Sequence, residues 1–203
     1  MIYSMTGFGR YEFTENNRKM TIEMKSVNHR YFDVNIKLPK KLGMFEADIR
    51  NMLKILFICH GNICRSTMAE SVFTHMVRER GIEDMFEINS AATSREEIGN
   101  TPHYGTVGKL RQVGIPLVPH RAIQMTKEDY QYYDYLIGMD SANIRNMNRI
   151  AGGDPEEKIY KLLTFAGSSR DVADPWYTGD FDATYRDVVE GLEGFLDTIM
   201  NRK

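Results

Sequence analysis

The chain has 203 residues, of which 42% are hydrophobic and 27% are charged, as in ordinary globular proteins. A formal net charge of −2 argues against a general nucleic-acid or membrane-surface binder, and no apolar stretch is long enough to span a bilayer. Two cysteines are too few for a disulfide framework, and residues 1–13 lack the pattern of a secretory signal, so we expect a cytoplasmic protein with free thiols.

Residues 1–52 predict a small extension built from a β-hairpin and a helix. The segment 10–39 is typical of two or three antiparallel strands, with apolar residues alternating from Phe32 to Leu38. An amphipathic helix is predicted over 42–53, and it runs almost directly into the next predicted strand. Because about fifty residues are marginal for an independent core, we expect no self-sufficient enzyme in this segment.

From residue 54 onward, short apolar runs alternate with helical patterns. Four runs indicate buried strands, at residues 54–58, 85–91, 134–139 and 158–163. Between the first two strands, apolar residues recur at helical spacing, and Gly81 is placed to end that helix. A capping box begins at Thr126, and residues 188–200 carry one long apolar stripe. This order predicts an α/β protein with a four-stranded parallel sheet covered by helices on both faces.

The stretch CHGNICRS, from Cys59 to Ser66, follows the first predicted strand and carries the candidate chemistry. Parallel sheets bind ligands at the carboxyl ends of their strands, where the turn into a helix gathers backbone N–H groups and the positive end of the helix dipole. Such a nest binds a phosphate dianion and favours the thiolate of Cys59, to which Ser66 can donate a hydrogen bond. Arg65 can hold two phosphate oxygens, and Gly61 and Asn62 suit a left-handed backbone.

A thiolate in this position predicts nucleophilic catalysis on a phosphate ester. Attack on phosphorus gives a phosphocysteine intermediate, and the leaving oxygen then needs a proton from a nearby carboxylic acid. Asp174 is the candidate acid, because it precedes Pro175 and an aromatic residue in a predicted loop between the fourth strand and the last helix. That loop can reach the same end of the sheet as Cys59.

Other roles for the two cysteines stay open on spacing alone. A zinc site would need a second Cys/His pair to complete its tetrahedron, and the chain offers no such pair. A redox motif usually has two residues between its cysteines, whereas four separate Cys59 from Cys64. The two thiols could also be a purely structural buried pair. The Gly-Asn and Arg-Ser context at a strand-to-helix turn favours one nucleophile.

Three stretches carry a family resemblance: ILFICHGNICRSTMAE, INSAATSREEIGNTPHYG and VADPWYTG. Together they resemble the low-molecular-weight protein tyrosine phosphatase family over residues 53–203, which implies a phosphatase I-like fold with flavodoxin-like strand order. The resemblance implies Cys59 as nucleophile, Arg65 as phosphate clamp, and Asp174 as general acid and then general base. It implies no metal and no cofactor. The implied partners are tyrosine-phosphorylated proteins, with phosphate or another oxyanion in the site.

The same resemblance assigns supporting residues by position. It implies a phosphate-binding loop formed by His60, Gly61, Asn62, Ile63, Cys64, Arg65 and Ser66. Ser90 and His120 match positions that hold this loop in shape. Trp176 and Tyr177 match a wall beside the substrate ring.

Three positions bear on specificity and regulation. Ile63 resembles the tyrosine phosphatases of this family, whereas a threonine there would resemble its arginine phosphatases. Glu96 falls where the family often has an aromatic residue on the pocket rim, which leaves the substrate preference open. Cys64 resembles a redox partner that can form a protective disulfide with Cys59. The related arsenate reductases use further cysteines, which this chain lacks.

Residues 1–52 resemble a second family. The stretches MIYSMTGFGRYEF and SVNHRYFDVNIKLP are similar to the start of the YicC-like endoribonucleases, whose longer remainder has no counterpart in this chain. We therefore predict a non-catalytic YicC-like fragment, residues 1–52, fused to a phosphatase domain, residues 53–203. The alternative function is RNA binding or processing through the mildly basic first fifty residues. Apart from that alternative, we expect neither a nucleic-acid nor a membrane partner.

Overall fold

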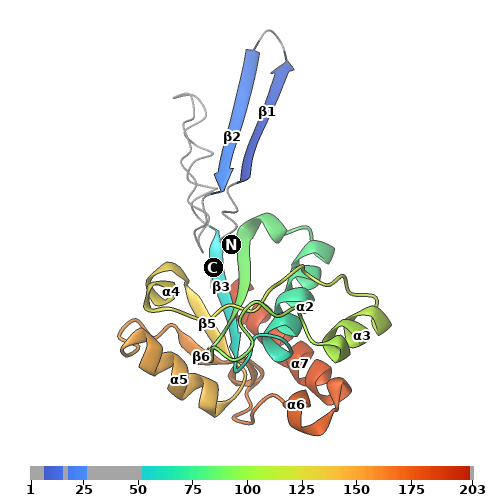
Figure 1. Cartoon of the computed structure of the whole chain (residues 1–203), viewed down its shortest axis with the longest axis vertical. Helices are drawn as coiled ribbons and strands as arrows, with labels where there is room; N and C mark the ends of the chain where they lie inside the picture. The colour runs from blue at the N-terminus through green and yellow to red at the C-terminus, as the bar shows by residue number, and fades with distance from the viewer. Residues whose placement is uncertain (1–6, 16–17, 27–51, 202–203) are drawn as a thin grey trace. The chain divides into compact units, whose positions relative to one another are not determined.

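The computed structural model describes residues 7–15, 18–26 and 52–201 (Figure 1). The chain divides into two units after residue 50, and each unit is described by itself. In the first unit, β1 (Gly7–Glu15) and β2 (Arg18–Ser26) form an antiparallel pair. This confirms the predicted hairpin, whereas the predicted third strand and most of the predicted helix lie outside the described residues. Leu53, predicted as the last residue of that helix, is instead the first residue of a strand.

The second unit contains a parallel four-stranded sheet. Its strands are β3 (Leu53–Cys59), β4 (Phe86–Ala92), β5 (Tyr135–Gly138) and β6 (Ile159–Lys161). They lie in the order β4-β3-β5-β6, and every neighbouring pair is parallel. This is the flavodoxin-like order that the resemblance implies, and all four predicted strands are confirmed. β6 is shorter than predicted, because Leu162 begins a 3-10 helix, η3 (Leu162–Ala166), in which Leu162 and Leu163 are both buried.

Helices cover both faces of this sheet (Figure 1). They are α2 (Arg65–Glu79), α3 (Tyr104–Gln112), α4 (Lys127–Tyr132), α5 (Ser141–Ala151), α6 (Pro175–Thr178) and α7 (Phe181–Met200), with a 3-10 helix η2 (Glu83–Met85) before β4. The chain leaves α2 as predicted, through Gly81 in the left-handed conformation with φ of 64°. Thr126 and Asp129 form the predicted capping box of α4. Among the helices of the described residues, none is long and apolar enough to cross a membrane.

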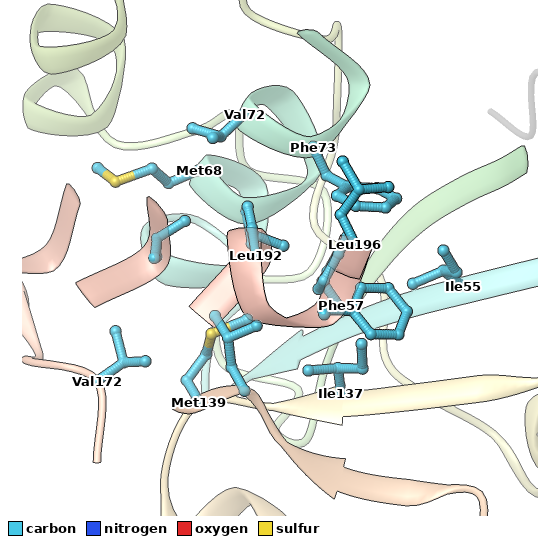
Figure 2. Close-up of a cluster of buried hydrophobic side chains, with 14 of the residues drawn as sticks. Ile55, Phe57, Met68, Val72, Phe73, Ile137, Met139, Val172, Leu192 and Leu196 are labelled. Carbon is cyan, nitrogen blue, oxygen red and sulfur yellow. The ribbon is translucent and has the colours of Figure 1, made fainter. Parts of the chain in front are cut away.

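The main hydrophobic core lies between one face of the sheet and the helices α2 and α7 (Figure 2). Phe73 of α2 is in its middle, with its ring centre 5.8 Å from that of Phe57 in β3 and 5.5 Å from that of Phe195 in α7. On the opposite face, Gly138 of β5 approaches α5 so closely that a Cβ there would lie 2.9 Å from Ile144. Packing on both faces fixes the position of β3. Its last residue, Cys59, therefore lies at the carboxyl edge of the sheet.

Candidate active site

The loop between β3 and α2 surrounds the sulfur of Cys59 with hydrogen-bond partners. The N–H of Asn62 donates to Cys59 Sγ at 3.2 Å, and Ser66 Oγ lies 3.1 Å from the same atom. Asn62 has the left-handed backbone expected of it, with φ of 58°. Ser66 Oγ already accepts a hydrogen bond from Asn62 Nδ2 at 2.9 Å, so its own O–H is available for the sulfur. The sulfur therefore sits where a thiolate would be stabilised.

The side chain of Asn62 joins the predicted supporting residues. Its Nδ2 donates to Ser66 and, at 2.8 Å, to Ser90 Oγ on β4. Its Oδ1 accepts from His120 Nε2 at 2.6 Å and from the N–H of Ile123 at 3.1 Å. All four hydrogen-bonding positions of the amide are used, and Asn62 is fully buried. The structure thus brings together Ser90 and His120 around the loop, as expected from the sequence.

Glu70 belongs to this network and was not predicted. Ser90 Oγ donates to Glu70 Oε2 at 2.6 Å, and His120 Nδ1 lies 3.5 Å from the same oxygen. Burial raises the pKa of Glu70 to about 7 and lowers the pKa of His120 to about 4. Glu70 follows Ser66 by four residues, so a helix starting at Arg65 puts both on one face, and that spacing was an available signal.

Arg65, the first residue of α2, is held by two carboxylates. Its Nη1 lies 2.6 Å from Asp140 Oδ2, and its Nη2 lies 2.5 Å from Asp174 Oδ2. Burial alone would lower the pKa of Arg65, but the negative charges of Cys59, Asp174 and Asp140 raise it overall. The guanidinium is therefore a permanent cation beside the sulfur of Cys59.

Asp140 is the second residue that the sequence interpretation missed. It lies two residues after the end of β5, and its other oxygen, Oδ1, accepts from the N–H of Asn143 at 2.6 Å to cap α5. Polar residues after buried parallel strands gather at one edge of a sheet. Asp140 lies just after the strand predicted at 134–139, so its position was an available signal for a contact near the cysteine loop.

Asp174 and the two predicted wall residues lie on one short segment. Asp174 is the N-cap of α6, and its Oδ1 accepts from the N–H of Trp176 at 3.1 Å. Trp176 and Tyr177 are exposed, by 61% and 85%. The rings of His103 and Trp176 pack edge to face, with their centres 6.2 Å apart. The backbone N–H of His103 donates to Ile63 O at 2.8 Å, which sets this aromatic rim against the cysteine loop.

Cys64 is a buried free thiol in the same loop. Burial first, and then the charges of Cys59 and Asp174, raise its pKa to about 12, so it stays protonated at neutral pH. Ile63 is also buried, and it forms a small apolar cluster with Cys64 and Ala122. Cys59 Sγ, by contrast, accepts a hydrogen bond from the N–H of Asn62 and lies 3.1 Å from Ser66 Oγ. The redox role of Cys64 stays a prediction.

Two carboxylates lie over the outer side of the loop. His60 Nε2 is 3.0 Å from Glu96 Oε2, and both side chains are exposed. A Cβ on Gly61 would lie 3.1 Å from Glu97 Cγ, so glycine leaves room for this segment. The N–H of Ser94 donates to His60 O at 3.0 Å and holds the two segments together.

Within the part of the chain that the structure describes, no group of three or more His, Cys, Asp or Glu residues could hold a metal ion.

Comparison with known families gives two adjoining matches. Residues 54–203 match the family "Low molecular weight phosphotyrosine protein phosphatase", and residues 2–58 match the family "Endoribonuclease YicC-like, N-terminal region". The two matches share residues 54–58, which lie within β3. Both resemblances expected from the sequence are therefore confirmed.

Individual relatives match the second unit over nearly their whole length. The Bacillus subtilis low molecular weight protein-tyrosine-phosphatase YfkJ is 38% identical over 75% of this chain and 99% of the relative. The human low molecular weight phosphotyrosine protein phosphatase is 38% identical over 70% of this chain and 93% of the relative. The crystal structure of YfkJ gives a TM-score of 0.72 over 75% of this chain and 97% of that one. The crystal structure of Drosophila arginine phosphatase, at 28% identity, gives a TM-score of 0.68 over 74% of this chain and 100% of that one.

Proposed function

This chain belongs to the low molecular weight phosphotyrosine protein phosphatase family, whose members share a cysteine-based mechanism, and from that premise we propose that Cys59 is its nucleophile. The observation that supports this most directly is the pair of hydrogen bonds to Cys59 Sγ from Asn62 and Ser66 beside buried Arg65. The catalytic unit in this proposal is residues 53–203. The expected oxyanion site is the loop from Cys59 to Ser66.

The first step transfers the phosphoryl group to sulfur. The Cys59 thiolate attacks phosphorus while Arg65 and the N–H groups of the loop stabilise the charge on the equatorial oxygens. The bond between phosphorus and the leaving oxygen breaks, and protonated Asp174 gives its proton to that oxygen. Since Asp174 Oδ2 lies 2.5 Å from Arg65 Nη2, the acid stands next to the phosphate clamp. The product is an alcohol or phenol and a phosphocysteine.

The second step returns the enzyme to its starting state. The Asp174 carboxylate accepts a proton from a water molecule, whose oxygen attacks phosphorus. The sulfur–phosphorus bond breaks, inorganic phosphate leaves, and the electron pair returns to Cys59 as thiolate. The O–H of Ser66 stabilises this thiolate leaving group, because it can donate to the sulfur at 3.1 Å.

The proposed substrates are tyrosine-phosphorylated proteins. Exposed Trp176 and Tyr177 stand on the segment that carries Asp174, where they can flank a phenyl ring. The relatives at 38% identity are named for phosphotyrosine or protein tyrosine. Protein arginine phosphatase is the second candidate, because the Drosophila structure of that name shares the fold at 28% identity. Ile63 favours phosphotyrosine as the substrate, because an apolar branched residue at this position resembles the tyrosine phosphatases of the family.

The proposed nucleophile is tested with p-nitrophenyl phosphate, in the presence of reductant and without added metal. We expect the full chain to hydrolyse it and Cys59→Ser to have no detectable turnover while it still binds inorganic phosphate, because the loop and Arg65 are unchanged. Undiminished turnover by Cys59→Ser would rule out the mechanism. Hydrolysis of phosphoarginine in preference to phosphotyrosine would instead favour the second candidate.

For residues 1–52 we propose a YicC-like fragment without catalysis, located with the phosphatase unit in the cytoplasm. Its match covers only the N-terminal region of that family. A reducing compartment suits an enzyme whose two cysteines are free. The alternative, RNA binding through this segment, would show as RNA affinity of the full chain that falls steeply with salt. Absence of RNA binding at low salt would rule out this alternative and favour the fragment without catalysis.

A further inference from the structure

Residues 168–174, which follow Gly167 at the end of η3 and precede α6, carry Asp174 and are called the acid loop here. Its end is tied to α7 through Ala173, whose N–H donates to Asp187 Oδ2 at 2.9 Å and whose carbonyl accepts from Thr184 Oγ1 at 2.9 Å. These bonds fix the backbone immediately before Asp174. They leave open how the first half of the acid loop is held.

Two neighbouring residues hold the first half of the acid loop: Arg170 pairs with Asp187 and Glu190 of α7, and Asp171, three residues before Asp174, binds the side of the loop that faces β6 and α5. Asp171 Oδ1 accepts from Lys161 Nζ at 2.8 Å and from both the N–H and the Oγ of Ser141, at 3.1 and 3.0 Å. Burial alone would raise the pKa of Asp171, but the hydrogen bonds from Lys161 and Ser141 lower it overall. Lys161 also donates to the carbonyl of Ser169. One lysine at the end of β6 thus holds both the side chain and the backbone of the acid loop.

The partners of Asp171 lead directly back to the phosphate clamp. Ser141 follows Asp140, which holds Arg65 Nη1 at 2.6 Å, and Asp174 lies 2.5 Å from Arg65 Nη2. The contacts therefore close a ring from Arg65 through Asp140, Ser141, Asp171 and Asp174 back to Arg65. Two consecutive residues at the start of α5 fix the clamp on one side and the acid loop on the other.

We propose that Asp171 is a positioning residue for proton transfer by Asp174, a role that rests on the proposed function. Its link to Ser141 and Lys161 sets where the acid stands relative to Arg65. A positioned acid contributes about 10²- to 10⁴-fold to rate, and a displacement of about 1 Å can cost about 10²-fold. Loosening the acid loop should therefore slow reactions that need the proton and spare phosphate binding.

The test compares phenyl phosphate, a poor leaving group, with p-nitrophenyl phosphate, a good one. Asp171→Asn should lower kcat/KM about tenfold for phenyl phosphate and less than about twofold for p-nitrophenyl phosphate, with the Ki of inorganic phosphate unchanged. Lys161→Met, which removes the cation from the same carboxylate, should show the same pattern. The matched control is Glu156→Gln, because Glu156 pairs with Lys158 at 3.0 Å just before β6, with similar exposure and no link to the acid loop. This control should leave kcat/KM unchanged for both substrates.

A double mutant separates positioning from general destabilisation. In an Asp174→Ala background, Asp171→Asn should cause no further loss with phenyl phosphate, because the acid that it positions is gone. The same fold loss in both backgrounds, or equal losses for the two substrates, would overturn the role of Asp171. An Asp174→Ala variant that slows both substrates equally would overturn the proposed acid itself, and the role of Asp171 with it.

Discussion

Asn62 combines a left-handed backbone, with φ of 58°, and a buried amide that donates twice and accepts twice. The backbone conformation turns its own N–H toward the sulfur of Cys59, while the side chain links α2, through Ser66, to β4, through Ser90, and to His120. A glycine could adopt the same backbone, but it could not supply the amide. The two contributions of this residue can therefore be separated by substitution.

Asn62→Gly and Asn62→Ala should both lose activity, by about 10- to 100-fold in kcat/KM, because Ser66, Ser90 and His120 lose their common partner. Only the alanine variant also has the cost of a Cβ at positive φ, so it should be less stable than the glycine variant by about 1 kcal/mol. Urea unfolding and steady-state kinetics on both variants measure this. Equal stability of the two would mean that the loop has left its conformation.

Prediction from sequence succeeded at this scale where the signal is local. Cys59, Arg65 and Ser66 lie in one short motif at a strand-to-helix turn, and the structure places them together. Asp140 and Glu70 each carried a local signal, the end of a predicted strand and the helical spacing from Ser66, but those signals do not identify their distant partners, Arg65 and His120. Hydrophobic patterns reveal which residues are buried, but they carry no signal for which buried polar groups meet.

At the scale of elements, α2 joins the loop to a buried titratable pair. Folded Glu70 has a pKa of about 7 against an ordinary value of 4.5, which alone would make stability fall as pH rises from 4.5 to 7. Folded His120 has a pKa of about 4 against 6.5, which alone would make stability fall as pH falls from 6.5 to 4. Between pH 4.5 and 6.5 the folded and unfolded pair each bind one proton, so the two effects cancel.

Glu70→Gln should expose the contribution of His120. Between pH 6.5 and 4.5 the stability of this variant relative to the unchanged protein should decline by about 1.4 kcal/mol for each pH unit lost. Urea unfolding at several pH values across this window gives the difference. Glu193→Gln on the exposed side of α7 is the control and should run parallel to the unchanged protein. If the stability of Glu70→Gln also followed that of the unchanged protein across this pH range, the opposing contributions of Glu70 and His120 would be contradicted.

The elements also differ in how far the sequence predicts them. α2 and α7 carry apolar stripes that pack on the core, and both were predicted. α5 (Ser141–Ala151) was not, because its sequence is rich in asparagine, a weak helix former, and its burial is limited to a few residues. Packing of Ile144 and Met147 against the glycine in β5 accounts for a helix there, and such a contact lies beyond local propensity.

For the whole molecule, the chemistry proposed here lies within the second unit. Every contact to Cys59, Arg65 and Asp174 described above comes from residues between 59 and 187, and β3 begins at Leu53. A form starting at Met52 should therefore keep the kcat and KM of the full chain with p-nitrophenyl phosphate. Side-by-side kinetics and thermal unfolding of the two forms test this. A higher activity of the shorter form would identify residues 1–51 as inhibitory.

The absence of any spacer between the two family matches has a mechanical consequence. Tension applied to the first unit would enter the second along β3, which is hydrogen-bonded to β4 on one side and β5 on the other. A slip of one residue would turn Cys59 to the other face of the sheet and away from Asn62 and Ser66. Turnover would stop at that slip, so catalytic activity would depend on the mechanical load carried by β3.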